Sequence, residues 1–309
     1  MASKRKRTPA GKQPRDRVPY SAIVDRPRLK LPGGARVVVW TIVNVEEWSI
    51  ERPMPRTVLP PPMGQPLLPD LPNWAWHEYG MRVGFWRFLE ALKRLDLRAT
   101  LAINGSVIKS YPRVAKAALD AGWEFMGHGY VQRPMHHLED QKKSIQQTIG
   151  AIKAFTGRAP RGWESPGLTE TYDTIDWLAE AGIEYVADWV LDDQPCLIDT
   201  RHGPVVSVPY TVEMNDISMM AIQHHPSAEW LRRGVDTFDR LHRDGGEQVR
   251  VMAISVHPYI TGAPHRIAYL EKLLEYIRSR EGVLLWTGEQ ILDWYLSQAK
   301  PSRRRKAHG

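Results

Sequence analysis

RVVVWTIV, residues 36–43, is an almost unbroken run of β-branched and aromatic side chains. A run of this kind, without polar alternation, is typical of a strand that is covered on both faces, as the strands of parallel sheets are. Asn44, Glu46 and Glu47 follow directly after it. The sequence therefore predicts a buried strand that carries polar side chains to one edge of a sheet.

Segments of strand length alternate with helical patterns along most of the chain. The predicted strands after the first cover residues 99–103, 123–126, a short segment near 161, 184–187, 205–208, 249–256 and 283–286. The predicted helices cover residues 82–95, 112–121, 138–156, 172–181, 228–241, 267–280 and 288–297. Strand–helix alternation at this spacing indicates a parallel sheet or barrel. Because neither an internal repeat nor a linker is evident, we predict one α/β domain over residues 21–298.

The formal net charge of +7 is unevenly distributed over the 309 residues. The two ends, residues 1–20 and 299–309, are strongly basic, and the body between them is mildly acidic. A nucleic-acid-binding domain shows the opposite arrangement, with basic charge gathered on the folded body, so we predict no nucleic-acid partner. We expect both ends to be disordered basic tails.

Cys196 is the only cysteine, so the chain can form no intrachain disulfide, which favours a reducing compartment. The basic start is followed by proline and charge rather than by an apolar run, unlike a secretory signal. No apolar stretch is long enough to span a bilayer. We therefore predict a cytoplasmic protein with no membrane partner.

A proline-rich passage, residues 51–80, interrupts the alternation of strands and helices. Six prolines within residues 58–72 argue against regular structure there. Loops of this length in a compact domain are usually functional or disordered. This passage carries Trp74, Trp76 and His77, whose rings are costly to leave in water, so we expect it to pack over another part of the protein, for example as a lid.

Polar or aromatic side chains follow nearly every predicted strand. They are Asn44, Glu46, Glu47, Asn104, His128, Trp163, Glu164, Asp188, Tyr210, His257 and Thr287. In a parallel barrel all strand carboxyl ends open on one face, and chemistry takes place on that face. The pattern therefore predicts an active site built from several strand ends.

Three of these side chains are the candidates for catalysis. Glu46 is expected to be partly desolvated, which would raise its pKa and suit a general base. His128, between two glycines, is presented from a sharp turn. His257, between an apolar strand and Pro258, suits a general acid or base near neutral pH. An ordinary surface carboxylate and hydrogen-bonded structural histidines are the alternative interpretations.

Two further details bear on the site. Trp163 has glycine and proline on both sides, which predicts a rigid exposed loop where the indole either stacks on a flat substrate or packs against the protein. A metal-binding histidine in a turn like that of His128 usually has a second histidine four residues later, where this chain has Gln132.

Four short motifs come in an order that is typical of one superfamily. They are Glu46-Glu47 after the first strand, Gly127-His128-Gly129, Arg161-Gly162-Trp163 and Ser255-Val256-His257-Pro258. Over residues 35–297 the chain resembles the polysaccharide deacetylase (NodB-homology) superfamily, and it is most similar to the branch of metal-independent allantoinases and cyclic-imide hydrolases. The resemblance implies a distorted (β/α)7 barrel, and it implies a homo-oligomer because family members often associate.

The chain departs from the metal-dependent members of that superfamily at three positions. Those enzymes use an Asp-Asp pair after the first strand and His-x-x-x-His after the third, whereas Asn44, Glu46 and Gln132 stand at three of these positions here. The resemblance to the metal-free branch therefore implies a hydrolase of C–N bonds other than peptide bonds. Its expected reaction is the ring opening of a small cyclic amide, imide or ureide without a tightly bound metal.

In this interpretation Glu46 positions or deprotonates water, His257 protonates the leaving nitrogen, and His128 holds the substrate carbonyl or the oxyanion. The residues expected to contact the small-molecule substrate are Asn44, Glu47, Trp74, Trp76, His77, Trp163, Glu164 and Asp188. Two alternatives stay open. One is a metal-dependent N-deacetylase of an amino sugar or polysaccharide, with zinc or another divalent cation. The other is a non-catalytic binding protein on the same scaffold.

Overall fold

The computed structural model describes residues 13–298 of the chain. The predicted tail 299–309 lies outside the described residues, and so does most of the predicted tail 1–20. Within residues 13–298, no helix is both long enough and apolar enough to cross a membrane.

A buried ion pair anchors the start of the described chain to the body. One helical turn, α1 (Pro14–Arg17), places the Arg17 guanidinium against the Asp176 carboxylate, with two hydrogen bonds of 3.0 Å and 2.6 Å. Burial would raise the pKa of Asp176, but the hydrogen bond from Arg17 lowers it to about 2. Residues 14–17 are therefore ordered, although the prediction included them in a disordered tail of residues 1–20.

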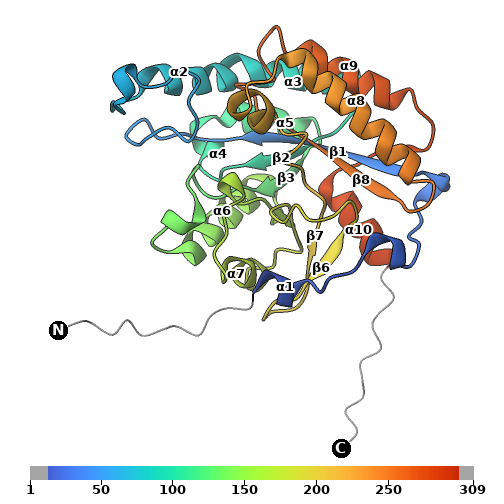
Figure 1. Ribbon diagram of the computed structural model, residues 1–309. Helices are drawn as coiled ribbons and strands as arrows, with labels where there is room; N and C mark the ends of the chain where they lie inside the picture. The colour runs from blue at the N-terminus through green and yellow to red at the C-terminus, as the bar shows by residue number, and fades with distance from the viewer. Residues whose placement is uncertain (1–12, 299–309) are drawn as a thin grey trace, which may run out of the picture.

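The strands form one curled sheet (Figure 1). They are β1 (Val37–Val45), β2 (Thr100–Ile103), β3 (Glu124–Gly127), β4 (Gly162–Trp163), β5 (Tyr185–Val186), β6 (Cys196–Ile198), β7 (Val205–Ser207), β8 (Arg250–Val256) and β9 (Val283–Leu285). The order is β6-β7-β5-β4-β3-β2-β1-β8, and β9 pairs with the first part of β1. Neighbours are parallel except β6 and β7, which are antiparallel, and β6 is absent from our predicted strands.

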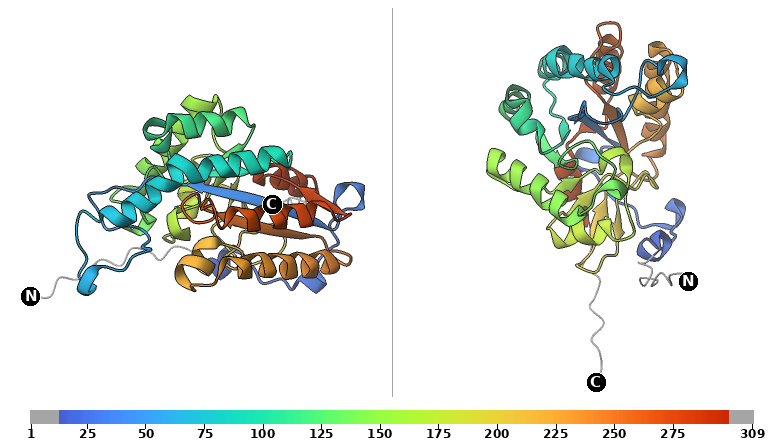
Figure 2. Two further views of the ribbon diagram at one scale, coloured as in Figure 1. Left: turned by 90° about the horizontal axis from the view of Figure 1, so that it is seen from above. Right: turned by 90° about the vertical axis from the view of Figure 1, so that its left-hand side faces the viewer.

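Helices surround the sheet. The α-helices after α1 are α2 (Leu71–Tyr79), α3 (Phe85–Arg94), α4 (Val107–Ser110), α5 (Pro112–Asp120), α6 (Gln141–Thr156), α7 (Thr174–Glu180), α8 (Ser227–Asp244), α9 (Ile267–Arg278) and α10 (Gly288–Gln298). Figures 1 and 2 show α3, α8 and α9 side by side over one face of β1 and β8. This arrangement confirms the predicted fold class, an α/β distorted (β/α)7 barrel.

All nine residues of β1 are buried, and their side chains alternate between two cores. Val39 and Val43 pack with the residues of α3, α8 and α9, whereas Trp40 and Ile42 pack in the interior of the barrel. Successive side chains of a strand point to opposite faces. Glu46 is an even number of residues from Trp40 and Ile42 and therefore points to the same face. The strand thus directs the carboxylate of Glu46 to the interior, and not that of its neighbour in the sequence.

Part of the proline-rich passage 51–80 is helical, which the sequence analysis did not predict. Its last residues form α2, and Pro72 lies in the first turn, where the missing N–H costs nothing. The side chain of Asp70 caps the helix by accepting from the backbone N–H of Asn73 at 3.3 Å. A π-turn at 80–84 joins α2 to α3, so the chain stays helical from α2 to the end of α3.

Two glycines let this helical segment lie directly on the loop that follows β8. A Cβ on Gly84 would lie 2.0 Å from the carbonyl oxygen of Pro258, and one on Gly80 would lie 2.6 Å from the backbone nitrogen of Tyr259. Backbone atoms cannot turn aside as the end of a side chain can, so this approach requires glycine. Because the loop begins at His257, the helical segment also fixes the position of that histidine.

We predict that Gly84→Ala lowers the free energy of unfolding by about 1–3 kcal/mol, because the new methyl group overpacks against a backbone carbonyl. Gly150→Ala in α6 is the matched control. No atom lies within 4 Å of its Cβ position, so higher helix propensity should stabilise the protein by about 0.5–1 kcal/mol. Chemical denaturation measures both variants, and equal stabilisation by the two alanines would contradict the close approach at Gly84.

Candidate active site

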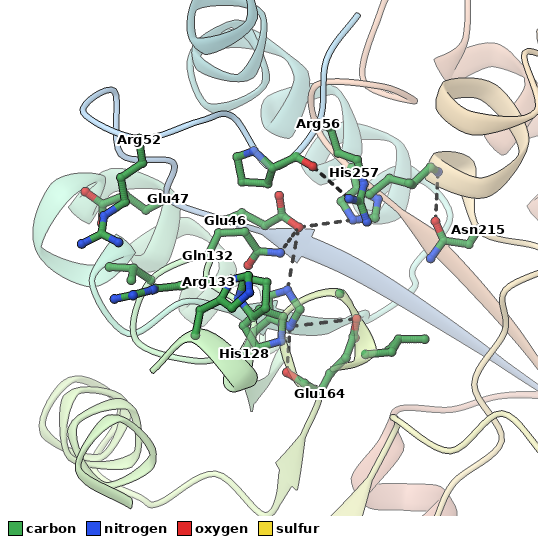
Figure 3. Close-up of a pocket in the computed structure, with 18 of the residues that line it drawn as sticks. Glu46, Glu47, Arg52, Arg56, His128, Gln132, Arg133, Glu164, Asn215 and His257 are labelled. Carbon is green, nitrogen blue, oxygen red and sulfur yellow. Dashed lines mark hydrogen bonds and ion pairs between the residues drawn. The ribbon is translucent and has the colours of Figure 1, made fainter. Parts of the chain in front are cut away.

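The carboxyl ends of the strands open on a cavity of about 800 Å³ (Figure 3). Its polar and charged lining residues are Glu46, Glu47, Ser49, Arg52, Arg56, His128, Gln132, Arg133, His137, Glu164, Tyr210, Asn215, Ser218 and His257. Residues that follow β1, β3, β4 and β8 therefore meet in one place. The three predicted catalytic side chains are among them.

Glu46 lies at the centre of the site, and both of its carboxylate oxygens accept hydrogen bonds. Oε1 accepts from Nε2 of Gln132 at 2.8 Å. Oε2 accepts from Nε1 of Trp48 at 2.7 Å and from the hydroxyl of Tyr259 at 3.2 Å. The side chain is buried, so its charge depends on these donors and on the neighbouring imidazoles.

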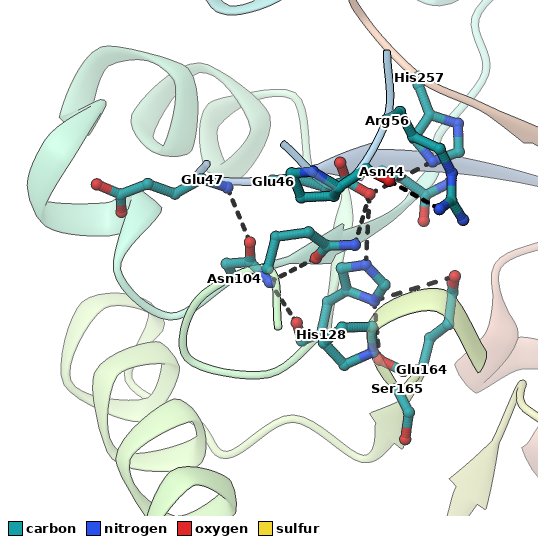
Figure 4. A network of polar contacts seen from close by, with 12 residues as sticks. Asn44, Glu46, Glu47, Arg56, Asn104, His128, Glu164, Ser165 and His257 are labelled. Carbon is teal, nitrogen blue, oxygen red and sulfur yellow. Dashed lines mark hydrogen bonds and ion pairs between the residues drawn. The ribbon is translucent and has the colours of Figure 1, made fainter. Parts of the chain in front are cut away.

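Two imidazoles point their Nε2 atoms toward Oε1 of Glu46 (Figures 3 and 4). The separations are 3.8 Å for His128 and 3.6 Å for His257. Nδ1 of His128 lies 2.8 Å from the backbone oxygen of Glu164, and Nδ1 of His257 lies 2.6 Å from Oδ1 of Asp216. A carbonyl or carboxylate oxygen only accepts, so Nδ1 carries a hydrogen in both rings and each ring is fixed from behind.

These contacts determine the charge of the site. Burial alone would raise the pKa of Glu46, but the nearby imidazoles of His128 and His257 and their charges hold it well below its usual range. Burial alone would lower the pKa of His257, but the carboxylates of Asp216 and Glu46 raise it to about 10. Burial also opposes the charge on His128, whose pKa Glu46 and Glu164 nevertheless raise. The raised pKa predicted for Glu46 is therefore wrong, because two imidazoles lie beside it.

Asp216 is a residue of the site that the sequence analysis missed. It is fully buried, and its Oδ2 accepts from the backbone N–H of His257 at 2.8 Å. It reaches this position because Asn215 forms a parallel bridge with Ser255 of β8. No predicted strand or motif precedes Asp216, so no local signal in the sequence identifies it.

Glu164 lines the cavity and is buried, and its Oε1 accepts from the hydroxyl of Tyr210 at 3.0 Å. Burial raises the pKa of Glu164 to about 7, although the charge of His128 acts against it. Asp188 lies behind this residue and does not line the cavity. It accepts from the backbone N–H of Ser165 at 2.6 Å and from its Oγ at 2.8 Å, so it supports the turn that carries Glu164.

Asn44 and Glu47, two predicted substrate contacts, occupy different places. Asn44 is fully buried outside the cavity lining, and its Nδ2 donates to Oγ of Ser255 at 2.8 Å. Glu47 lines the cavity, and its Oε1 accepts from Oγ of Ser110 at 2.6 Å. Of these two side chains, the structure brings only Glu47 to the cavity.

Trp163 is fully buried in β4, so the prediction of an exposed loop is wrong. A Cβ on Gly127 would lie 2.7 Å from the indole ring, and Nε1 donates to Oγ of Ser165 at 3.0 Å. The neighbouring Gly162 also makes room for a ring, because a Cβ there would lie 2.1 Å from the ring of Tyr185. The glycines around Trp163 therefore indicate close packing of aromatic rings, and the indole forms no wall of the cavity.

Trp74, Trp76 and His77 lie on α2, and none of them lines the cavity. Trp76 packs edge-on against Trp48, with the ring centroids 6.3 Å apart. His77 stacks on Trp48 at 4.7 Å, and its Nε2 lies 2.8 Å from the backbone oxygen of Glu46. Trp76 and His77 therefore support Glu46 from behind and do not form the predicted lid. The residues of the passage 51–80 that do line the cavity are Arg52, Pro53, Pro55 and Arg56.

The donor atoms at this centre do not fit a tightly bound metal ion. Gln132 directs an amide N–H, which is not a ligand, at Oε1 of Glu46, and an indole and a phenol occupy Oε2. Within residues 13–298, no three His, Cys, Asp or Glu side chains are grouped so that they could hold an ion. A divalent cation held by Glu46 and His128 would have too few ligands for tight binding.

Comparison with known proteins agrees with the barrel fold and with the class of hydrolases. Residues 77–186 match the family described as "Polysaccharide deacetylase". A protein of Schizosaccharomyces pombe named "Putative polysaccharide deacetylase" is 30% identical over 237 residues, which cover 69% of this chain and 73% of the relative. "Peptidoglycan deacetylase" of Helicobacter pylori is 25% identical over 265 residues, which cover 70% and 85%. The chain belongs to the polysaccharide deacetylase family.

Two solved structures share the fold over nearly their whole length. "Puue Allantoinase" has a TM-score of 0.81 and 26% identity, covering 93% of this chain and 98% of that one. A "probable Polysaccharide deacetylase" from Pseudomonas aeruginosa PAO1 has a TM-score of 0.79 and 26% identity, covering 88% and 95%. The predicted superfamily and the hydrolase class are confirmed.

We predict that Asp216→Asn lowers the pKa of His257 from about 10, because burial is then opposed mainly by Glu46. NMR titration of the ring Cε1–H measures this pKa. Below the ordinary value of 6.5 the charged ring contributes its full stabilisation of the fold, and this is lost as the pH rises through 10. The variant should therefore lose less stability over that range.

Asp236→Asn on α8 is the control for this titration, because Asp236 pairs with Arg232 on the surface. It removes the same charge without touching the site. A pKa of His257 that is equal in the two variants would show that Asp216 does not hold the charge on the ring.

Proposed function

We propose that this deacetylase-family hydrolase opens the ring of a small cyclic amide, imide or ureide and needs no tightly bound metal. The observation that carries the proposal is the 2.8 Å hydrogen bond from the Gln132 amide to Glu46. It puts a neutral donor where the metal-dependent members of the family use a second histidine. The similarity to a structure named as an allantoinase supports the same reaction class.

The chemistry of the substrate is consistent with this choice. Hydrolysis of an acetamide expels a strongly basic amine, so Lewis-acid assistance by a metal is valuable. A cyclic imide or ureide has a more electrophilic carbonyl, and a second carbonyl stabilises its leaving nitrogen. Positioned imidazole and carboxylate groups are then sufficient for acid–base catalysis and for stabilising the oxyanion.

His257 is assigned the role of general acid. A pKa of about 10 keeps its ring protonated at neutral pH, and its Nε2 lies 3.6 Å from Oε1 of Glu46 at the cavity. When the C–N bond breaks, the leaving nitrogen takes the proton from Nε2. Asp216 holds Nδ1–H throughout, so it positions the ring without contacting the substrate.

His128 is assigned the role of holding the substrate carbonyl. Burial opposes charge on this ring, but Glu46 and Glu164 raise its pKa, so the ring carries a hydrogen on both nitrogens. Its Nε2–H is buried and has no hydrogen-bond partner, so it can donate to the carbonyl oxygen and to the oxyanion that forms there. Although its low pKa makes Glu46 a weak base, this carboxylate holds the water that attacks the carbonyl carbon and accepts its proton as the new C–O bond forms.

Glu46→Gln and His257→Ala are each predicted to lower kcat/KM by about 10²–10⁴-fold while the fold stays intact. The first variant removes the central carboxylate, and the second removes the general acid. Steady-state kinetics with circular dichroism checks both statements. Glu51→Gln, an exposed residue outside the cavity lining, is the control for loss of a carboxylate. Full activity in both site variants would rule out this assignment.

A hydrolysis screen over allantoin, hydantoins, dihydropyrimidines, succinimides and N-acetylated sugars, run with and without a chelator, tests the proposed function. We expect ring opening of at least one cyclic substrate that persists in the chelator. The proposal is wrong if the protein instead removes acetyl groups from sugars, loses this activity in the chelator and retains stoichiometric zinc through dialysis.

A further inference from the structure

Three arginines line the cavity and have no carboxylate partner. Arg52 and Arg56 come from the proline-rich passage, and Arg133 comes from the turn after β3. None of the three forms an ion pair with another side chain of the described residues. Surface arginines elsewhere in the structure commonly pair with acidic neighbours, as Arg232 does with Glu229 at 2.6 Å. The cavity therefore offers unneutralised positive charge to whatever enters it.

Arg56 has the most specific environment of the three. It is half-buried, and one terminal nitrogen donates to the backbone oxygen of Pro55 at 2.8 Å. Its Nε–H is buried and has no hydrogen-bond acceptor. A buried donor without an acceptor is unfavourable, and an acceptor on a bound molecule would remove that cost. Figures 3 and 4 show Arg56 beside His257, next to the proposed reaction centre.

Arg52 and Arg133 lie toward the opposite side of the cavity, near Glu47 and Gln132 (Figure 3). Positive groups that face one another across a cleft concentrate anions in its mouth. The central carboxylate, Glu46, repels a negative group, so an anion bound here must sit on the arginine side chains. The arrangement separates an anion-binding rim from the carboxylate–imidazole centre.

We infer that the substrate is an anionic cyclic amide, which carries a carboxylate that the Arg56 guanidinium binds. This inference rests on the proposed function, since the scissile ring is placed at Glu46, His128 and His257. A guanidinium presents two parallel N–H donors that match the two oxygens of a carboxylate. A cavity of about 800 Å³ has room for a ring and such a side arm.

The same arrangement discriminates against neutral rings. A neutral ring leaves the buried Nε–H of Arg56 without an acceptor, whereas a ring with a carboxylate arm satisfies it. Arg133 and Arg52 then add long-range attraction, which salt should weaken. The specificity expected of this site is therefore for charge on the arm rather than for the size of the ring.

The test compares two probes that differ mainly in charge, 5-carboxymethylhydantoin and 5-methylhydantoin. We expect wild-type kcat/KM to favour the carboxylated probe by at least about tenfold, mostly through KM. Arg56→Gln should bring this ratio close to one. Arg56→Lys keeps the positive charge but lacks the two parallel N–H donors of the guanidinium, so it should give an intermediate ratio. Arg243→Gln is the control, because Arg243 is exposed on α8 and lies outside the cavity lining.

The outcomes separate this inference from the proposed function. Turnover of both probes with equal kcat/KM, or a ratio unchanged by Arg56→Gln, overturns the inference and leaves the proposed function in place. If neither probe is hydrolysed, calorimetry measures their binding to the intact protein. Tighter binding of the carboxylated probe that Arg56→Gln abolishes then supports charge recognition, and equal binding overturns it. Melting temperatures of the variants confirm that each is folded.

Discussion

A buried carboxylate held between two imidazoles is the interaction on which the site depends. A charge removed from water is tolerated only where hydrogen bonds and opposite charge replace the lost solvent. For Glu46 these come from Gln132 and Tyr259 on its oxygens, and from His128 and His257 within 3.8 Å. This interaction holds the pKa of Glu46 low, and Asp216 together with Glu46 raises the pKa of His257.

Much of the surrounding fold keeps these groups in place. The long central strand β1 delivers Glu46 to the barrel interior, and His77 on α2 contacts its backbone. Gly84 lets the helical segment lie on the loop that begins at His257, and Asp216 holds that imidazole from the other side. A set of neutral donors and packed elements therefore holds the side chains of this site in position.

Local sequence patterns predicted the parts that depend on one element at a time. The buried run that became β1 and the polar strand ends indicated a parallel sheet or barrel and predicted that Glu46, His128 and His257 lie at one face. The (β/α)7 barrel itself was implied by the resemblance to the superfamily. Trp163 was misplaced because glycine signals both loops and close ring packing. Asp216 was missed because only the bridge between distant segments brings it to the site. The cytoplasmic location and the homo-oligomeric state stay predictions.

The ionisation of Glu46 shows directly whether the two imidazoles stabilise a buried charge at this site. In protein labelled with ¹³C at glutamate carboxyls, the Glu46 signal can be assigned by its absence in a glutamine variant and followed against pH. We expect this carboxyl to stay ionised as the pH falls through 4.5, the ordinary pKa of a glutamate, because the two imidazoles stabilise its charge. Protonation of Glu46 at or above pH 4.5 would show that they do not.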